Sequence, residues 1–166
     1  LGEFNRAELD RTVDGLKRIW TEPGAVIQYY PLTYTSFWVE YHLWGLTPVG
    51  YHLVNMILHG INAVLVWIVL CRLSIPGAWL AAALFAIHPV NVESVAWVTE
   101  RKNVLSGLFY LTALLAYLRF FDTTDKRWNA AALGLFVCAL LSKTAVCTLP
   151  VAILLIVWWK RDRCEW

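Results

Sequence analysis

The stretch VGYHLVNMILHGINAVLVWIVLC, residues 49–71, decides the fold class of this chain. It contains no Asp, Glu, Lys or Arg. At a rise of 1.5 Å per residue, a helix of this length is about 35 Å long, which is enough to cross the hydrocarbon core of a bilayer. The stretch therefore predicts a membrane-spanning helix.

Four polar residues recur within this stretch at intervals of three or four positions. They are His52, Asn55, His59 and Asn62. This spacing places them on one face of a helix. Polar residues inside a span usually face the protein interior, where they either hydrogen-bond to a neighbouring helix or line a cavity. The first interpretation is favoured, and the second stays open.

Further apolar segments follow along the chain. They cover residues 76–88, 104–121, 128–141 and 145–159. The first is only about 20 Å long as a helix and breaks at His88-Pro89, which predicts a helix broken at membrane depth. A single helix through the last two would bury Lys143 near the bilayer centre, so we expect a turn at residues 142–144 and a kink at Pro150.

Residues 1–47 differ from the rest because they are polar and aromatic. Leu9, Val13, Leu16 and Trp20 recur at helical spacing among charged residues, which is typical of an amphipathic helix on a membrane surface. Pro23-Gly24 is expected to end this helix, and Pro31 to begin a second one that runs to about Trp44. We therefore predict an all-α fold: interfacial helices in residues 1–47, then a multi-pass bundle of about five membrane segments in residues 48–166.

Composition agrees with a membrane protein. Hydrophobic residues make up 59% of the 166 residues and charged residues 16%, against about 25% in ordinary globular chains. The net charge of +2 and the absence of a long basic run argue against a nucleic-acid partner. The four cysteines lack metal-ligand spacing, and no cofactor or metal motif is evident. Since Leu1 is not a natural start, we expect a fragment.

Basic residues predict the orientation. If the five segments alternate, one set of loops and ends holds seven basic residues: Arg72, Arg119, Lys126, Arg127, Lys160, Arg161 and Arg163. The other set holds three: Arg101, Lys102 and Lys143. The excess of Lys and Arg marks the cytoplasmic side, so residues 1–47 are expected on the extracytoplasmic side.

Five polar or ionisable residues that could bind a ligand are expected at the outer ends of adjacent segments. They are His88, Glu93, Arg101, Lys102 and Lys143. Arg and Lys at a membrane boundary are natural ligands for a phosphate, and a carboxylate can bind a sugar hydroxyl, orient an Arg or act as a base. The residues alone favour a plainer interpretation, in which these groups anchor helix ends or form structural ion pairs.

Several strings, in their order and spacing, resemble one family of membrane proteins. The strings are YYPLT (29–33), LWGL (43–46), GYHLVN (50–55), LFAIHPVNVESVAW (84–97), ERKNVLS (100–106) and LLSKT (140–144). They resemble bacterial proteins related to the transmembrane and tetratricopeptide-repeat (TMTC-like) O-mannosyltransferases, within the GT-C glycosyltransferase superfamily. The resemblance extends over residues 20–159.

The resemblance implies an inverting transferase that takes a sugar from a polyprenyl-phosphate donor on the extracytoplasmic side and passes it to a protein or glycan. Arg101, Lys102 and Lys143 would bind the donor phosphate. His88, Asn91, Tyr29 and Tyr30 would line the cavity. The acidic base of such enzymes is expected upstream of Leu1, with Glu93 as a further candidate, so the fragment alone is expected to be inactive.

Two alternatives stay open beside the enzyme. The chain can belong to a non-catalytic membrane scaffold that presents tetratricopeptide repeats, or to a lipid-linked sugar transporter. In each case the expected location is a membrane, with a bacterial inner membrane as the first choice and lipid as an immediate partner. The need for a divalent metal is not determined by the sequence.

Overall fold

The computed structural model describes residues 12–22 and 28–164, with side chains up to Lys160, and all of its regular elements are helical. Leu9 and the Pro23-Gly24 pair lie outside the described residues. The elements are α2 (Val13–Thr21), α3 (Pro31–Trp44), α4 (Pro48–Arg72), α5 (Ala78–Ile87), η1 (Pro89–Asn91), α6 (Val92–Ala96), η2 (Val98–Glu100), α7 (Arg101–Thr123), α8 (Lys126–Ser142), η3 (Thr144–Thr148) and α9 (Leu149–Cys164). The predicted all-α fold is confirmed.

Capping residues, proline and glycine mark the ends of the two short helices before the bundle. The Thr12 hydroxyl accepts a hydrogen bond from the Gly15 amide at 3.0 Å and caps the start of α2. Pro31 is the first residue of α3, where its missing N–H costs nothing. α3 ends at Trp44 and is followed by Gly45, whose φ of 60° favours glycine. The predicted helix from Pro31 to Trp44 is confirmed.

Two helices are long and apolar enough to cross a membrane. They are α4 and the continuous run Val98–Thr123, which contains α7. The pair formed by α5 and residues 89–96 is bent by 48°, and it adds a third span if the pair is counted as one. Large apolar side chains stand exposed along α4, α5 and α9, as expected for surfaces that meet lipid or neighbouring protein. The prediction of about five membrane segments stays a prediction.

The two predicted breaks are present. α5 ends before His88, whose extended backbone suits a residue that precedes proline, and η1 begins at Pro89. Lys143 is likewise extended and separates α8 from η3. The kink expected at Pro150 is wrong: this residue is the second of α9, so it helps to begin a helix rather than to bend one.

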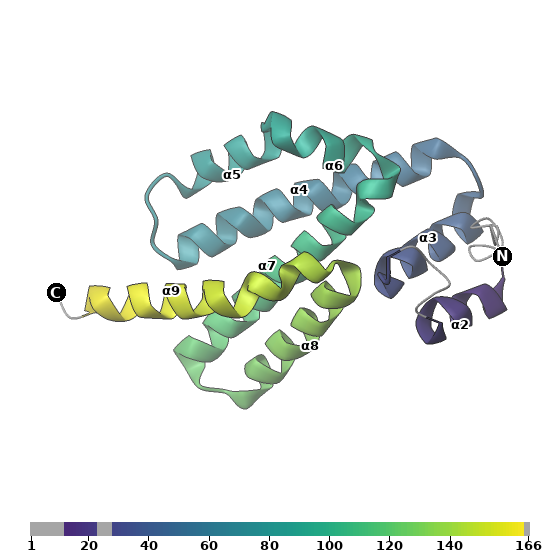
Figure 1. The fold of residues 1–166 in the computed structure, drawn as a ribbon. Coiled ribbons are helices and arrows are strands. Elements are labelled where there is room, and N and C mark those ends of the chain that lie inside the picture. Colours follow the sequence, from purple (N-terminus) through teal and green to yellow (C-terminus); the bar gives the residue numbers. More distant parts are fainter. Residues whose placement is uncertain (1–11, 23–27, 165–166) are drawn as a thin grey trace.

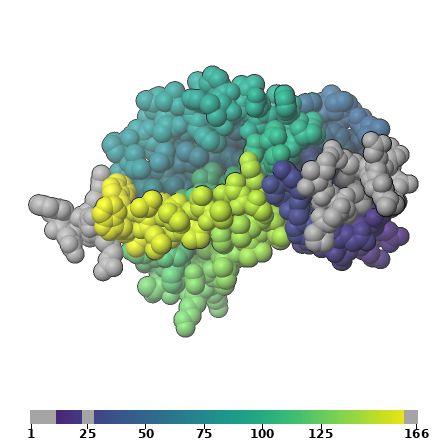
Figure 2. Space-filling view, in the orientation of Figure 1, coloured from purple at the N-terminus to yellow at the C-terminus, as the bar shows by residue number. Residues whose placement is uncertain are grey.

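The helices run back and forth between two ends of the molecule (Figure 1). α2 and α3 gather at one end, next to the start of α4 and the turn between α8 and α9. An apolar core centred on Val69, Leu114, Leu118 and Leu149 lies toward the other end. Figure 2 shows α9 across the face in view, between α4–α6 on one side and α7–α8 on the other.

Ion pairs close the end away from α3. The Asp122 carboxylate binds Arg72 at 3.1 Å and Lys160 at 3.0 Å, which joins the ends of α4, α7 and α9. Arg72 and Lys160 belong to the basic set predicted to face the cytoplasm, and Arg101 and Lys143 lie at the opposite end. Which side of a membrane each end faces stays a prediction.

Candidate functional site

The polar face of α4 holds the broken segment and α7 in place. The Asn55 amide donates to the carbonyls of Val95 and Trp97 at 3.3 and 3.1 Å. The His59 ring bonds to the Ala86 carbonyl at 3.0 Å. These bonds support the interpretation that the polar face of α4 makes contacts between helices. The pockets described below show that residues of this face also line cavities.

Arg101, the first residue of α7, is fully buried in an ion pair. Its guanidinium donates to both carboxylate oxygens of Glu40 on α3, with Nη2–Oε2 at 3.1 Å. Nε donates to the Asn55 side-chain oxygen, and Nη2 also donates to the Tyr51 carbonyl at 2.9 Å. The Phe37 ring lies 5.4 Å from the guanidinium carbon. Arg101 therefore joins α3, α4 and α7.

This placement bears on the phosphate role predicted for Arg101. A phosphate could reach the guanidinium only if Glu40 moved away, because the guanidinium is enclosed and its three nitrogens all donate to protein oxygens. The structural ion pair considered from the sequence is present, and the partner of Arg101 is Glu40. The phosphate role of Arg101 stays a prediction, and this geometry disfavours it.

A second polar network links Lys143 to Lys102 through Asn103 and Glu100. Lys143 Nζ donates to the side-chain oxygen of Asn103, although 40 residues separate them. The Asn103 amide nitrogen donates to Glu100 at 2.7 Å and to Ser94 Oγ at 3.0 Å. Glu100 also pairs with Lys102 at 3.2 Å. Two of the three predicted phosphate ligands thus lie on one network.

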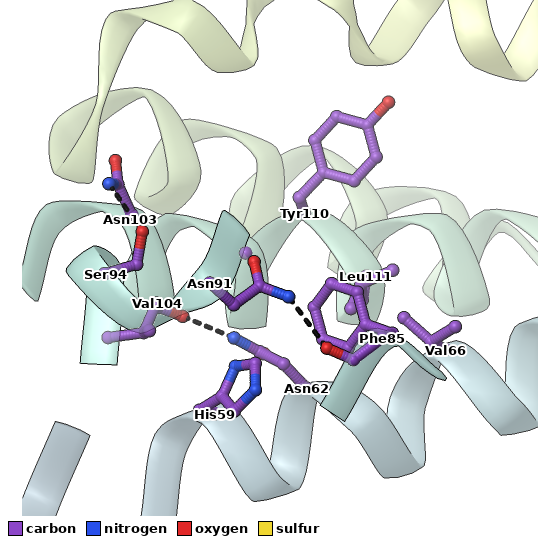
Figure 3. A pocket seen from close by; sticks show the side chains of 11 residues that line it. His59, Asn62, Val66, Phe85, Asn91, Ser94, Asn103, Val104, Tyr110 and Leu111 are labelled. Carbon is purple, nitrogen blue, oxygen red and sulfur yellow. Dashed lines mark hydrogen bonds between the residues drawn. The ribbon is translucent and has the colours of Figure 1, made fainter. Parts of the chain in front are cut away.

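Two pockets are lined by residues of this network, and a third lies next to one of them. The Asn62 pocket has a volume of about 290 Å³, and Figure 3 shows side chains from α4, the α5–α6 break and α7 around it. It is lined by His59, Asn62, Val66, Phe85, Asn91, Ser94, Asn103, Val104, Gly107, Tyr110 and Leu111.

The other two pockets adjoin it. The Lys143 pocket, of about 340 Å³, is lined by Asn103, Ser106, Gly107, Tyr110, Lys143, Ala145, Val146 and Thr148. The His88 groove, of about 580 Å³, is lined by His52, Met56, His59, Ala86, Ile87, His88, Asn91, Val92, Val95 and Ala96. Each shares lining residues with the Asn62 pocket, so the three pockets are neighbours.

The remaining predicted site residues divide into two groups. His88 and Asn91 line pockets, and Asn91 also donates to the Phe85 carbonyl at 2.7 Å. Glu93, Tyr29 and Tyr30 are absent from the lining of these three pockets. Glu93 is exposed on α6, and the Tyr29 hydroxyl donates to the Trp20 carbonyl at 3.0 Å, which ties the chain before α3 to α2.

The structure adds residues that the sequence reasoning did not single out as site residues. Glu40 had no local signal, because its partner Arg101 is 61 residues away. Asn103 stands inside the string ERKNVLS, directly after two candidates, and its position there was the available signal. Among the described residues, no group of three or more His, Cys, Asp or Glu side chains is placed to hold a metal ion.

Comparison with known proteins gives relatives of one kind. The human Protein O-mannosyl-transferase TMTC3 is 37% identical over 114 residues, which is 67% of this chain and 12% of that protein. The Drosophila melanogaster Protein O-mannosyl-transferase Tmtc1 is 36% identical over 132 residues, 76% of this chain and 15% of that protein. The Xenopus laevis Protein O-mannosyl-transferase tmtc2 is 39% identical over 105 residues, 62% of this chain and 13% of that protein.

The chain therefore spans only 12–15% of the length of these three relatives. All three are animal proteins, so the bacterial origin expected from the sequence stays a prediction. No family model matches the chain, and no solved structure matches it.

Proposed function

Because this chain is homologous to one segment of the TMTC protein O-mannosyl-transferases, we propose that it is part of a membrane glycosyltransferase. The observation that carries the proposal is the similarity over 132 residues to a protein named for this activity. In the proposed reaction, a mannosyl group passes from a polyprenyl-phosphate donor to a protein acceptor. The reaction takes place at the end of the bundle where α3, Arg101 and Lys143 lie, on the extracytoplasmic side.

In this proposal the reaction takes place at the neighbouring pockets around Asn103. An acceptor hydroxyl oxygen attacks the anomeric carbon of the sugar, the bond from that carbon to the phosphate oxygen breaks, and polyprenyl phosphate leaves. A general base takes the proton of the acceptor hydroxyl. Negative charge grows on the leaving phosphate, and a fixed cation beside it stabilises the transition state.

Lys143 is the side chain best placed for this role in the proposal. It lines a pocket, and its hydrogen bond to Asn103 holds the ammonium near the start of α7. Lys102 is next to this network and adds positive charge, partly offset by its ion pair with Glu100. Arg101 supports the site from inside by holding α3 on the ends of α4 and α7.

The test is sugar transfer by the full-length protein in liposomes, with mannosyl polyprenyl phosphate as donor and varied donor concentration. Loss of one charged hydrogen bond costs roughly 1.5–3 kcal/mol, so Lys143→Ala should lower kcat/KM about ten- to a hundredfold. Lys126→Ala is the matched control, since Lys126 is an exposed lysine at the opposite end of the bundle. Rates are normalised to folded protein.

Absence of sugar transfer by the wild-type protein would contradict the proposed enzymatic function. It would favour the non-catalytic scaffold, which the enclosed, fully bonded Arg101 also suits. Equal kcat/KM in Lys143→Ala and wild type would remove Lys143 from the site.

A further inference from the structure

The Asn62 pocket contains a buried acceptor without a partner. Asn62 is 3% exposed, and its Oδ1 atom has no hydrogen-bond partner among the described residues. Leaving a buried polar atom unpaired costs about 1–3 kcal/mol, and such atoms in native proteins call for an explanation. Asn62 is ten residues from Arg72, so it lies about 15 Å along α4 from that boundary, at a depth where polar groups are usually functional.

The orientation of this amide is fixed. Its nitrogen donates to the Val104 carbonyl at 2.8 Å (Figure 3). A carbonyl oxygen can only accept, so the amide cannot be turned over without placing two acceptors together. Oδ1 therefore stays unpaired until a hydrogen-bond donor enters the pocket that Asn62 lines.

The chemistry of the pocket suits a neutral ligand with hydroxyl groups. None of its lining residues is Asp, Glu, Lys or Arg. Asn91 and Ser94 add side-chain oxygens that can accept hydrogen bonds. Phe85 and Leu111 supply apolar surface beside these groups, and small-molecule sites combine the two in this way.

A cationic pocket lies directly beside this neutral one. Asn103, Gly107 and Tyr110 line both the Asn62 pocket and the Lys143 pocket. A ligand that lies across these three residues would place a neutral, hydroxylated part near Asn62 and an anionic part near Lys143. A sugar joined to a phosphate has this arrangement of charge.

We propose that the Asn62 pocket is the subsite for the sugar ring of the donor, with Asn62 Oδ1 accepting a hydrogen bond from a sugar hydroxyl. This inference rests on the proposed function, since it divides the donor between the two pockets: sugar at Asn62, phosphate at Lys143. Asn62 is then a residue that recognises the sugar, separate from the group that binds the phosphate.

The experiment measures binding of two lipids to the full-length protein in detergent. One lipid is mannosyl polyprenyl phosphate, and the other is polyprenyl phosphate without sugar. Asn62→Leu keeps the side chain close in size and removes the acceptor. From the worth of one hydrogen bond, it should weaken binding of the mannosyl lipid about three- to tenfold and leave the sugar-free lipid unchanged.

A second variant covers the possibility that Asn62→Leu does not fold. A Cβ at Gly107 would come within 3.1 Å of the Asn62 amide nitrogen, so Gly107→Ala crowds the pocket without deleting any polar group. Gly107 lines both pockets, but every atom near this Cβ belongs to Asn62, so the change should weaken binding of the mannosyl lipid more than binding of the sugar-free lipid. Gly60→Ala is the matched control, because Gly60 is on the same helix as Asn62 and a Cβ there meets nothing within 4 Å.

The outcomes separate this inference from the proposed function. Sugar transfer by the wild type, together with equal losses for both lipids in the variants, would overturn the sugar subsite and leave the enzyme standing. The same holds if the variants raise only the KM for the acceptor in the transfer assay, because the pocket would then hold part of the acceptor. Failure of the wild type to bind or use either lipid would overturn both.

Discussion

At the scale of single residues, the end of the bundle next to α3 depends on the pair of Arg101 and Glu40. Buried ions are costly unless each is paired and hydrogen-bonded. Besides its bonds to Glu40, Arg101 donates to the Asn55 side-chain oxygen and to the Tyr51 carbonyl. Each nitrogen of the guanidinium therefore has a hydrogen-bond partner although the residue is 0% exposed. Removing one partner would leave a buried charge without compensation.

Glu40→Ala should therefore destabilise the protein strongly. Breaking a buried pair by removing one partner costs roughly 3–5 kcal/mol, which should lower both the yield of folded protein and its melting temperature in detergent. Lys17→Ala is the control: it breaks the pair of Lys17 with Asp14, whose side chains are 72% and 88% exposed, and such pairs contribute about 0–1 kcal/mol. Similar melting temperatures for both variants would contradict the role given to Arg101.

What the sequence predicted of these residues follows from distance along the chain. The spacing of Asn55, His59 and Asn62 predicted a shared face, because three and four residues make about one turn of a helix. The partner of Arg101 had no such signal, since no local period links residues 40 and 101. A contact across 61 residues is decided by how whole helices pack, and a single sequence does not contain that information.

At the scale of elements, α3 is held on the bundle at two points. One is the Glu40–Arg101 pair. The other is a buried hydrogen bond from the Thr33 hydroxyl to the Ser142 carbonyl at 3.2 Å, at the last residue of α8. Lys143 follows Ser142 directly, so this hydrogen bond supports both α3 and the proposed phosphate site.

Thr33→Val should loosen α3 without unfolding the bundle. It keeps the shape of the side chain and removes a hydrogen bond worth about 1 kcal/mol, so the amides of α3 should exchange with solvent about fivefold faster. Thr123→Val serves as the control, since the exposed Thr123 hydroxyl bonds only within its own helix, to the Arg119 carbonyl. Unchanged exchange in α3 would show that this second anchor contributes nothing.

Elements were predictable where a local rule applies. The break at His88-Pro89, the start of α3 at Pro31 and the turn at Lys143 follow from proline geometry or from the cost of a charge in lipid. Helix ends were less predictable: α7 begins at Arg101 and not at residue 104, because burial of the Arg101 side chain against α3 lets a charged residue join a span. Pro150 is compatible both with the first turn of a helix and with a kink, and the local sequence does not decide between them.

At the scale of the whole molecule, the two opposite ends of the bundle differ in their polar groups. Arg72, Asp122 and Lys160 close one end with ion pairs, and the other end holds the pockets and the buried Arg101. From Arg101 to Asp122 the helix α7 rises about 32 Å, close to the thickness of a bilayer core. Each end is therefore expected at a membrane surface, with the pockets open to the extracytoplasmic side.

This orientation predicts a labelling pattern in intact cells. The described native cysteines are Cys71, Cys138, Cys147 and Cys164; these are first replaced. A single cysteine from Glu93→Cys should then react with an impermeant thiol reagent from outside, and one from Thr124→Cys should not, because these exposed positions lie at opposite ends. Labelling at Thr124 without labelling at Glu93 would reverse the orientation.

The central claim, that the pockets beside Lys143 and Asn62 hold the sugar-phosphate part of the donor, is tested most directly by photocrosslinking. Mannosyl polyprenyl phosphate with a photoreactive group on its sugar is bound to the full-length protein, irradiated, and the modified peptide is identified by mass spectrometry. The account predicts labels within residues 59–66 or 103–111, which line the Asn62 pocket, and their loss when unlabelled donor is in excess. Competable labels at the Arg72–Asp122–Lys160 end, with none in the pocket, would contradict it.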